Sequence, residues 1–175
     1  MKILAVVVCL LALLTSNVAM GETEETITKL SQEQMTTLRG DLPESGIVTG
    51  GQPNEATLRK FAEAGYGAVI DMRANDEDRG FDEPKFVESL GMTYVALPIA
   101  GADDVSFDKA AELDKILAEF DEPVLVHCAS GNRVGALFAL RAKNLGASSE
   151  DALMIGQAAG VTRLEGLVKE RLELK

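Results

Sequence analysis

Four residues at fixed spacing, His127, Cys128, Gly131 and Arg133, have the side chains needed to bind and attack an oxyanion. The apolar, β-branched run at residues 124–126 directly before them is typical of a buried strand. From Arg133 onward the apolar residues recur at helical spacing, which predicts a helix. Cys128 is therefore expected where a strand ends, and Arg133 where a helix begins.

A loop that leads into the first turn of a helix is suited to an anion. Its unpaired backbone N–H groups and the helix dipole both favour negative charge, and Gly131 permits the tight turn that such a loop needs. Arg133 adds a planar guanidinium that matches two phosphate oxygens. The same field favours the thiolate form of Cys128, which could attack a bound tetrahedral anion. The residues expected to hold the anion are Ala129, Ser130, Gly131, Asn132 and Arg133.

The pattern His-Cys-x-x-Gly-x-x-Arg resembles the phosphate loop of the cysteine-dependent protein tyrosine and dual-specificity phosphatases. More narrowly, residues 127–133 look like the bacterial phosphatase-like family related to the beta-lactamase-hydrolase-like proteins. Residues 50–53 (Gly-Gly-Gln-Pro) and 69–73 (Val-Ile-Asp-Met-Arg) resemble upstream motifs of that family, so the resemblance covers residues 46–145. It implies a dual-specificity-phosphatase-like fold and hydrolysis of phosphomonoesters through a phospho-cysteine intermediate.

Hydrolysis by this route needs a proton donor for the leaving alkoxide or phenoxide. The resemblance implies an Asp on a loop upstream of the cysteine-bearing strand, which makes Asp104 or Asp103 the candidate acid. These two residues are equally well interpreted as caps of the helix that follows Ser106. Residues alternate along a strand, so His127 should point away from Cys128 and support the loop through hydrogen bonds rather than act as a general base.

Asp71 and Arg73 come at the end of another predicted strand, and both are expected near the loop: Arg73 as a further anion ligand, Asp71 as a support. They also resemble the Ile-Asp-x-Arg stretch of rhodanese sulfurtransferases, so a persulfide on Cys128 that passes on sulfur is an alternative. Val134 stands where the phosphatase pattern usually has Ser or Thr, whose hydroxyl helps the thiolate leave. This departure argues against fast turnover. A third interpretation is therefore a non-catalytic domain that binds phosphate or another oxyanion.

Strand-like and helix-like segments alternate along the chain. The expected strands lie at residues 47–49, 68–72, 93–97 and 124–126. The alternation predicts a three-layer α/β fold with a mostly parallel sheet of four to five strands, in which ligands bind beyond the carboxyl ends of the strands.

Other segments carry weaker expectations. Residues 22–45 have only a partial helical stripe and are expected to form a linker or loose helix before a phosphatase-like domain at residues 46–175. Residues 75–79 are expected to form an exposed charged loop. Residues 162–174 have the pattern of a last amphipathic helix.

Residues 1–21 have the composition of a secretory signal. Lys2 precedes an apolar segment, residues 3–14, that is too short to span a bilayer comfortably. Cleavage after residue 21 would place the domain in the periplasm or outside the cell, with no membrane segment left.

The mature chain would be acidic. The sequence has 17 Lys and Arg, one of them Lys2, against 28 Asp and Glu, so 16 basic residues and a formal net charge of −12 would remain. Such a surface repels nucleic acid, and the expected partner is a phosphorylated small molecule or a phosphoprotein. Cys128 would be the only cysteine, which rules out an intramolecular disulfide. A lone histidine without a recognisable cysteine or carboxylate cluster argues against a metal site, and the chemistry needs no organic cofactor.

Overall fold

The structure is a computed structural model, and it describes residues 25–37 and 42–175. The predicted signal at residues 1–21 lies outside the described residues. None of the helices in the two described ranges has the length and apolar character that a membrane span needs.

Five short strands form one sheet. In spatial order they are β1 (Ile27–Lys29), β2 (Ile47–Gly50), β5 (Val124–His127), β3 (Ala68–Asp71) and β4 (Thr93–Ala96). Every neighbouring pair is parallel, which confirms the predicted α/β class. Connections between parallel strands must cross over the sheet, and here helices make most of these crossovers.

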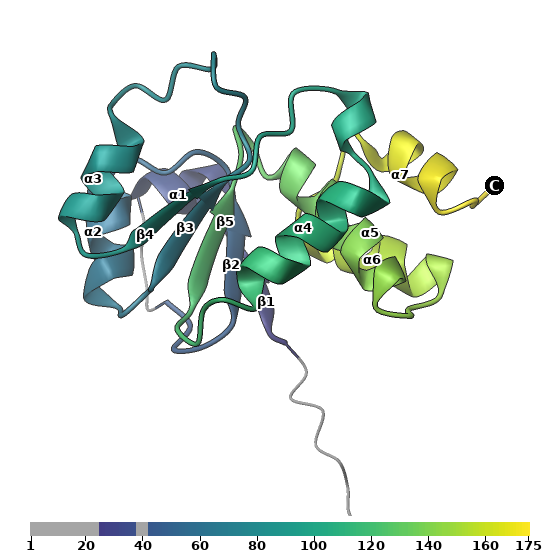
Figure 1. Cartoon of the computed structure of the whole chain (residues 1–175), viewed down its shortest axis with the longest axis horizontal. Helices are drawn as coiled ribbons and strands as arrows, with labels where there is room; N and C mark the ends of the chain where they lie inside the picture. The colour runs from purple at the N-terminus through teal and green to yellow at the C-terminus, as the bar shows by residue number, and fades with distance from the viewer. Residues whose placement is uncertain (1–24, 38–41) are drawn as a thin grey trace, which may run out of the picture.

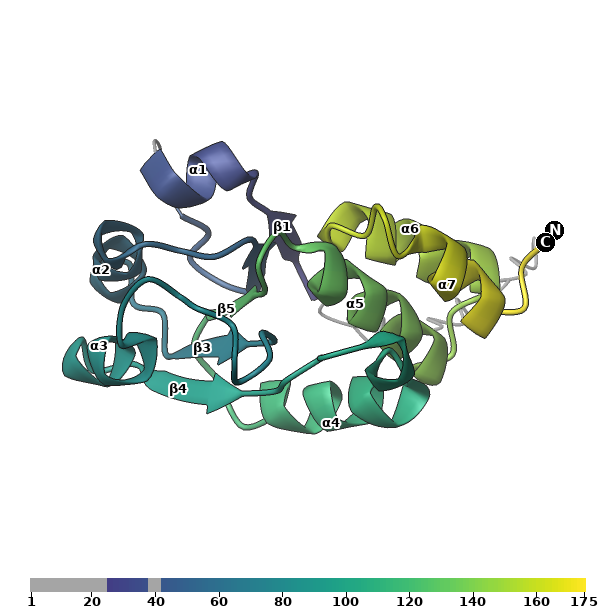
Figure 2. The same cartoon turned by 90° about the horizontal axis from the view of Figure 1, so that it is seen from above.

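Helices cover both faces of the sheet, which gives three layers (Figures 1 and 2). One face carries α1 (Gln32–Thr37), α2 (Glu55–Glu63) and α3 (Glu83–Ser89). The other carries α4 (Phe107–Leu117), α5 (Asn132–Asn144), α6 (Ser149–Ala159) and α7 (Glu165–Arg171). A short 3-10 turn, Ala102–Asp104, precedes α4.

The two faces have separate apolar cores because side chains alternate along each strand. In β5, Val124 and Val126 pack in the core under α4 to α7, whereas Leu125 packs in the core under α1 to α3. All three are buried. A strand buried on both sides has a continuous apolar sequence, which is why residues 124–126 carry the clearest strand pattern.

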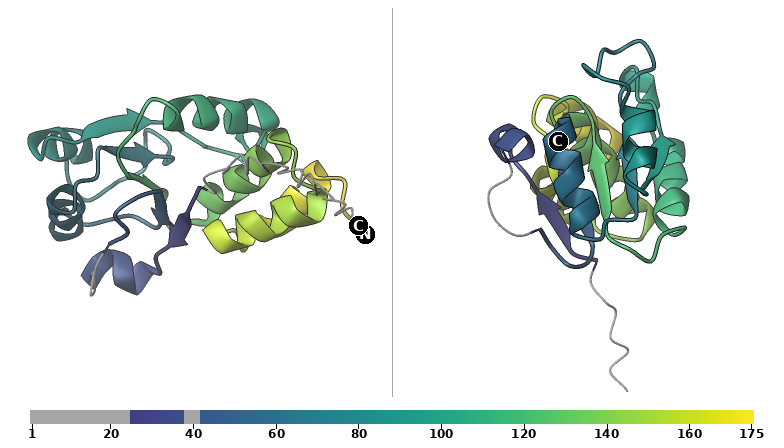
Figure 3. Two further views of the ribbon diagram at one scale, coloured as in Figure 1. Left: turned by 90° about the horizontal axis from the view of Figure 1, so that it is seen from below. Right: turned by 90° about the vertical axis from the view of Figure 1, so that its left-hand side faces the viewer.

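The N-terminal segment differs from the predicted linker or loose helix. Ile27–Lys29 form the edge strand β1, which pairs with β2, and the helix found in the described part of this segment is Gln32–Thr37 (Figure 3). Leu30 N donates to Thr49 O at 2.8 Å, which continues the pairing beyond β1. Pairing with β2 therefore determines the conformation of Ile27–Lys29, whose own residues have only a weak preference for a helix or a strand. The sheet therefore begins upstream of residue 46.

The last helix begins later than predicted, at Glu165 rather than Thr162. Asn132 explains the difference, because its Oδ1 accepts hydrogen bonds from Thr162 N at 2.9 Å and from Leu164 N at 3.2 Å. These bonds hold residues 162–164 in a loop against the N-terminus of α5. The segment therefore supports the predicted anion loop instead of lengthening α7.

The carboxyl ends of the parallel strands share one edge of the sheet, and the loops that follow them meet above it (Figure 1). Gly50, Asp71 and His127 end the three central strands β2, β3 and β5, and the register pairs His127 with both of the others. Ligands bind at this edge in open parallel sheets. The candidate site is built from these three strand ends.

Candidate active site

The loop after β5 has the geometry that its sequence predicts. Cys128 follows the strand, and Gly131 directly precedes the first residue of helix α5, Asn132. Gly131 has a φ of 81°, a left-handed conformation that favours glycine. The first bond of the helix runs from Gly135 N to Gly131 O, at 2.9 Å. The amides of the first three helical residues therefore have no acceptor within the helix and can donate to an anion.

The turn after β2 supports this loop from one side. Cys128 N donates to Gly50 O, and Gln52 N donates to Ala129 O, both at 3.3 Å. A Cβ on Gly51 would lie 1.9 Å from Gln32 Oε1 and 3.0 Å from Ala129 O, so a side chain there would meet Gln32 first and would also crowd the loop. The Gly-Gly-Gln-Pro turn is therefore part of the site.

The remaining predicted loop residues differ in exposure. Ala129 and Ser130 are exposed at the tip of the loop, whereas Asn132 is buried. The side chain of Asn132 is occupied by the 162–164 segment, so its backbone amide is the group left for an anion. Val134 is fully buried in the core under α4 to α7, the core that also contains Cys128.

Arg133 uses one side of its guanidinium for structure. Nη1 donates to Glu77 Oε1 and, at 3.0 Å, to Ile99 O, and Nη2 donates to Glu77 Oε2 at 2.9 Å. A guanidinium has five N–H donors, so Nε–H and one Nη2–H remain. These two donors form a fork that matches two phosphate oxygens. Attraction to Cys128 and a hydrogen bond with it are further causes that raise the pKa of Arg133, so the guanidinium and this cysteine are neighbours.

Glu77 orients Arg133 from a loop that was expected to be exposed. Its carboxylate also accepts hydrogen bonds from Ala74 N at 2.7 Å and from Arg73 Nε at 3.1 Å. The hydrogen bond from Arg133 is the largest cause that lowers the pKa of Glu77 from 4.5 to about 2. The same bond raises the pKa of Arg133. The pair is therefore ionised at any physiological pH.

Arg73 holds the same loop together. Its Nη1 donates to Gln52 Oε1, and its Nη2 donates to Asp78 O at 2.8 Å. With the bond to Glu77, these contacts make Arg73 a support of the loop. A direct contact between Arg73 and an anion stays a prediction.

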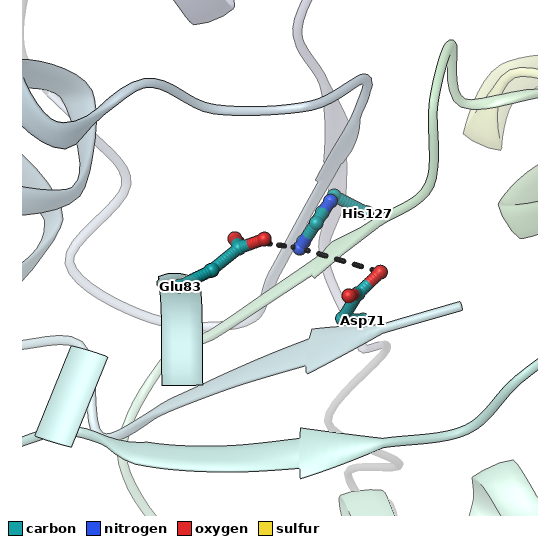
Figure 4. A group of neighbouring side chains, drawn as sticks. All are labelled: Asp71, Glu83 and His127. Carbon is teal, nitrogen blue, oxygen red and sulfur yellow. Dashed lines mark ion pairs between the residues drawn. The ribbon is translucent and has the colours of Figure 1, made fainter. Parts of the chain in front are cut away.

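His127 and Cys128 point to opposite sides of the sheet, as predicted. Cys128 packs under α4 to α7, while the fully buried His127 points toward Glu83 at the start of α3. His127 Nε2 lies 3.0 Å from Glu83 Oε1 and 3.8 Å from Asp71 Oδ1 (Figure 4). Across the ring, Nδ1 lies 3.4 Å from Cys128 O. The ring thus links two buried carboxylates to the backbone of the candidate nucleophile.

Both carboxylates have further partners. Asp71 Oδ2 accepts hydrogen bonds from Arg79 Nε at 2.6 Å and from Tyr94 Oη at 2.8 Å. Glu83 Oε2 accepts one from Gln52 Nε2 at 2.9 Å. Burial, with the bond to Asp71 as a second cause, raises the pKa of Tyr94, so its hydroxyl remains a donor. Asp71 is thus held between Arg79 and Tyr94, and its role as a support of the anion loop stays a prediction.

Sequence reasoning missed the carboxylates around His127 and the inward position of Arg79. Atoms of Asp71, Glu83 and His127 lie within 4.8 Å of one another, a spacing that a metal ion could bridge. The expectation that His127 has no carboxylate cluster is therefore wrong. Glu83 lies in a first helical turn, where acids are common in any helix, so its sequence carried no signal of burial. The expectation of an exposed loop at residues 75–79 fails at Arg79, whose side chain is 13% exposed.

The two candidate acids occupy different positions. Asp104 Oδ2 accepts hydrogen bonds from Ala100 N at 2.8 Å and from Gly101 N at 3.3 Å, so Asp104 closes its own loop. Ser106, rather than either Asp, caps α4, which corrects the interpretation of the pair as caps of that helix. Asp103 is exposed. The role of either residue as an acid stays a prediction.

The loop that carries these acids forms one wall of a pocket of about 280 Å³ whose other wall includes Arg133. The lining residues are Ile99, Ala100, Gly101, Ala102, Val105, Asn132, Arg133 and Leu164. Pockets for small ligands measure roughly 300–1,000 Å³. This pocket lies just below that range, and neither Cys128 nor the two candidate acids are among its lining residues.

The sequence has relatives among bacterial proteins. Residues 20–165 match the family described as DSP-PTPase phosphatase fused to NAD+ kinase, or PTP-NADK. Over 98 residues, 54% of this chain, it is 33% identical to the beta-lactamase hydrolase-like protein of Xylella fastidiosa and 29% identical to that of Agrobacterium fabrum. The match spans 22% of each of these relatives.

Solved structures share the fold. A protein of Neisseria meningitidis assigned as a phosphatase superposes with a TM-score of 0.61 at 25% identity, over 73% of this chain and 91% of that one. Kinase associated phosphatase, with its catalytic-site cysteine replaced by serine, superposes with a TM-score of 0.56 at 14% identity, over 74% of this chain and 88% of that one. TpbA of P. aeruginosa superposes with a TM-score of 0.53 at 20% identity, over 70% of this chain and 76% of that one. The fold is that of the dual-specificity-like phosphatases, and the chain belongs to the family of DSP-PTPase phosphatases fused to NAD+ kinase.

Proposed function

We propose that this protein hydrolyses phosphomonoesters through a phospho-cysteine intermediate. The observation that supports the proposal is that Arg133 interacts with Cys128 at the N-terminus of α5 while two of its N–H donors are not used by Glu77 or Ile99. A phosphoryl group held there would meet the fork, the loop amides and the positive end of the helix dipole. Charge that develops on its oxygens in the transition state would be stabilised by donors already in place.

The reaction has two displacements at phosphorus. The Cys128 thiolate attacks, an S–P bond forms, and the P–O bond to the leaving alkoxide or phenoxide breaks. The leaving oxygen takes a proton from the acid. Water then attacks the same phosphorus, loses a proton to the carboxylate, and the S–P bond breaks to return the thiolate and inorganic phosphate.

The acid is proposed to come from the loop that carries Asp103 and Asp104. Asp104 Oδ2 is engaged by two backbone amides, which fixes the carboxyl group and leaves Oδ1 to carry a proton. Asp103 is exposed and free to turn toward a bound substrate. The two residues are therefore separate candidates that one pair of variants can distinguish.

Val134 is proposed to slow the second displacement. A hydroxyl at this position would donate to the sulfur as it leaves, and a fully buried valine cannot. The phospho-cysteine intermediate should therefore accumulate, and its hydrolysis should limit the rate.

The test is hydrolysis of an aryl phosphate, with mass spectrometry of the protein stopped during turnover. The proposal expects a phosphate adduct on Cys128 and complete loss of hydrolysis in Cys128→Ser, while Glu88→Gln, an exposed change on α3, keeps its activity. A persulfide on Cys128 together with thiocyanate formation from thiosulfate and cyanide would instead indicate sulfur transfer. Anion binding without an adduct or turnover would indicate a binding domain. Either result overturns the proposal.

The setting of the reaction is part of the proposal. A signal at residues 1–21 would export the domain to the periplasm or the medium, and the acidic mature chain would act on a phosphorylated small molecule or a phosphoprotein rather than on nucleic acid. Fractionation of the native host with an antibody against the domain tests this location.

A further inference from the structure

Three side chains with metal-ligating atoms come together in the core on the α3 side of the sheet. Asp71 ends β3, His127 ends β5, and Glu83 is the first residue of α3. All three are fully buried, and the two dashed lines of Figure 4 meet at His127 Nε2. Buried polar groups are costly unless each atom has a partner. The partners of these side chains therefore indicate what the cluster binds.

Two of the atoms that face one another lack such a partner. Glu83 Oε1 and His127 Nε2 lie 3.0 Å apart, yet neither takes part in a hydrogen bond within the described ranges. The distance suits a hydrogen bond, so the direction of approach is what fails. Across the ring, Nδ1 faces Cys128 O at 3.4 Å, and hydrogen belongs on Nδ1 because a carbonyl only accepts. Nε2 of the neutral ring then has a lone pair that faces a carboxylate oxygen, and a cation between them would stabilise both.

The outer oxygens of the two carboxylates are held by hydrogen bonds. Gln52 Nε2 donates to Glu83 Oε2 at 2.9 Å. Asp71 Oδ2 accepts hydrogen bonds from Arg79 Nε at 2.6 Å and from Tyr94 Oη at 2.8 Å. Metal ligands in proteins are typically oriented in this way, by neighbouring groups that bond the atoms that do not bind the ion. The carboxylate oxygens left for an ion beside the ring are Glu83 Oε1 and Asp71 Oδ1.

We propose that His127 Nε2, Glu83 Oε1 and Asp71 Oδ1 bind a divalent transition-metal ion such as Zn²⁺. Nε2 lies 3.0 Å from Glu83 Oε1 and 3.8 Å from Asp71 Oδ1, and donors that share one Zn²⁺ at about 2.0–2.2 Å lie about 3–4 Å apart. Asp71 Oδ1 accepts a hydrogen bond from Arg73 N at 2.8 Å and keeps a second lone pair for the ion. An imidazole beside carboxylates suits Zn²⁺ better than Mg²⁺ or Ca²⁺, which prefer oxygen ligands.

The charge of the cluster also favours a cation. Arg79 pairs with both Asp71 and Glu83, but one guanidinium cannot balance two carboxylates, and unbalanced buried charge is costly. A bound ion would join the ends of β3 and β5 to the start of α3. It would be a structural ion that stabilises the folded state, and the inference does not rest on the proposed hydrolysis.

The first test measures the metal content of refolded protein. Because the ligands are buried, untagged protein is unfolded in urea with a chelator, refolded with Zn²⁺ in an excess of Mg²⁺, dialysed, and analysed by mass spectrometry of the elements. The Mg²⁺ occupies exposed acids. The wild type should retain about one Zn²⁺ per chain. Glu83→Gln keeps the shape of the side chain but removes a ligand, so it should bind Zn²⁺ more than about 100-fold more weakly.

Two control variants locate the ion. Glu88→Gln, an exposed change on α3, should keep the Zn²⁺. Cys128→Ser should keep it as well, because Cys128 packs on the other side of the sheet, in the core under α4 to α7. No Zn²⁺ in the wild type, or Zn²⁺ retained by Glu83→Gln, overturns the proposal. An ion lost with Cys128→Ser would be bound at the candidate nucleophile instead, which also overturns it.

The second test needs only the wild type, so it stands even if Glu83→Gln does not fold. His127 is the only histidine of the chain, and 15N-labelled protein gives one imidazole spin system in a long-range proton–nitrogen spectrum. Refolding with Zn²⁺ should shift the Nε2 resonance and leave hydrogen on Nδ1. It should also raise the urea midpoint of unfolding relative to protein refolded with chelator. A ring spectrum and a midpoint that Zn²⁺ leaves unchanged would show that a proton or a water, and not a metal, lies between these side chains.

Discussion

Glu77→Gln removes the charge that orients Arg133 and keeps the shape of the side chain. The wild-type carboxylate accepts hydrogen bonds from Arg133 at both oxygens, and from Arg73 and the Ala74 amide. A glutamine has one accepting oxygen, and its NH₂ group would face a guanidinium. Arg133 would then lose its fixed direction. We expect lower stability and weaker binding of phosphate.

The magnitude follows from the pKa of Glu77, which is lowered from 4.5 to about 2, chiefly by the Arg133 hydrogen bond. In a shielded pair a shift of this size would correspond to about 3 kcal/mol. Because the side chain is 26% exposed, solvent screens the pair, and we expect about 1–2 kcal/mol. A depressed folded-state pKa gives stability that is fully present above about pH 4.5 and is lost as the pH falls to about 2.

The assay is urea unfolding of the wild type, Glu77→Gln and the exposed control Glu88→Gln at several pH values. At pH 7 Glu77→Gln should be about 1–2 kcal/mol less stable than the wild type, and the difference should shrink toward zero near pH 2. Inorganic phosphate should bind the variant about tenfold more weakly. The reasoning is refuted by a stability difference that does not change with pH, or by a Glu77→Gln protein as stable as Glu88→Gln at pH 7.

Two further predictions concern turnover. Asp103→Asn and Asp104→Asn each keep an accepting oxygen, so the loop should keep its conformation in both variants. The variant that removes the acid should hydrolyse substrates with poor leaving groups about 10²–10⁴-fold more slowly, and substrates with good leaving groups should be affected far less. Equal losses on both kinds of substrate would place the acid elsewhere. Val134→Thr adds a hydroxyl to a side chain of similar shape. The wild type should release a burst of product equal to the enzyme concentration, and in the variant this burst should be smaller and the steady-state rate higher. The buried hydroxyl should lower the free energy of unfolding by about 1–3 kcal/mol. Val134→Ala, without a hydroxyl, should not speed turnover, and a wild type without a burst would contradict the assigned slow step.

The parts of the site that sequence could predict are those encoded locally. Cys128, Gly131 and Arg133 lie within six residues, and a buried strand followed by a helix is enough to place them. The opposite directions of His127 and Cys128 likewise follow from strand alternation alone. Each of these inferences uses only neighbours in the chain. For that reason they did not depend on knowing how distant segments pack.

The partners of these residues come from elsewhere in the chain. Glu77 meets Arg133 across 56 residues, and Gln52 meets Glu83 across 31. Glu77 lies in the connection between β3 and α3, whose charged sequence is also typical of an exposed loop, and Glu83 is the first residue of α3. Nothing local separates an acid that is solvated from one that is held by a guanidinium. The parallel order of the strands brings these loops together, and that order is a property of the whole sheet.

The position of the acids also bears on what the overall charge means. The chain has a net charge of −11, which at first argues against a dianionic substrate. Yet Glu77, Glu83 and Asp71 are paired with arginines, Arg133 and Arg73 at Glu77 and Arg79 at the other two. These acids hold the arginines in place, and Glu77 and Ile99 leave two N–H donors of Arg133 for other partners. The negative net charge therefore does not by itself argue against an anion at the loop, because the acids nearest to it are paired with arginines.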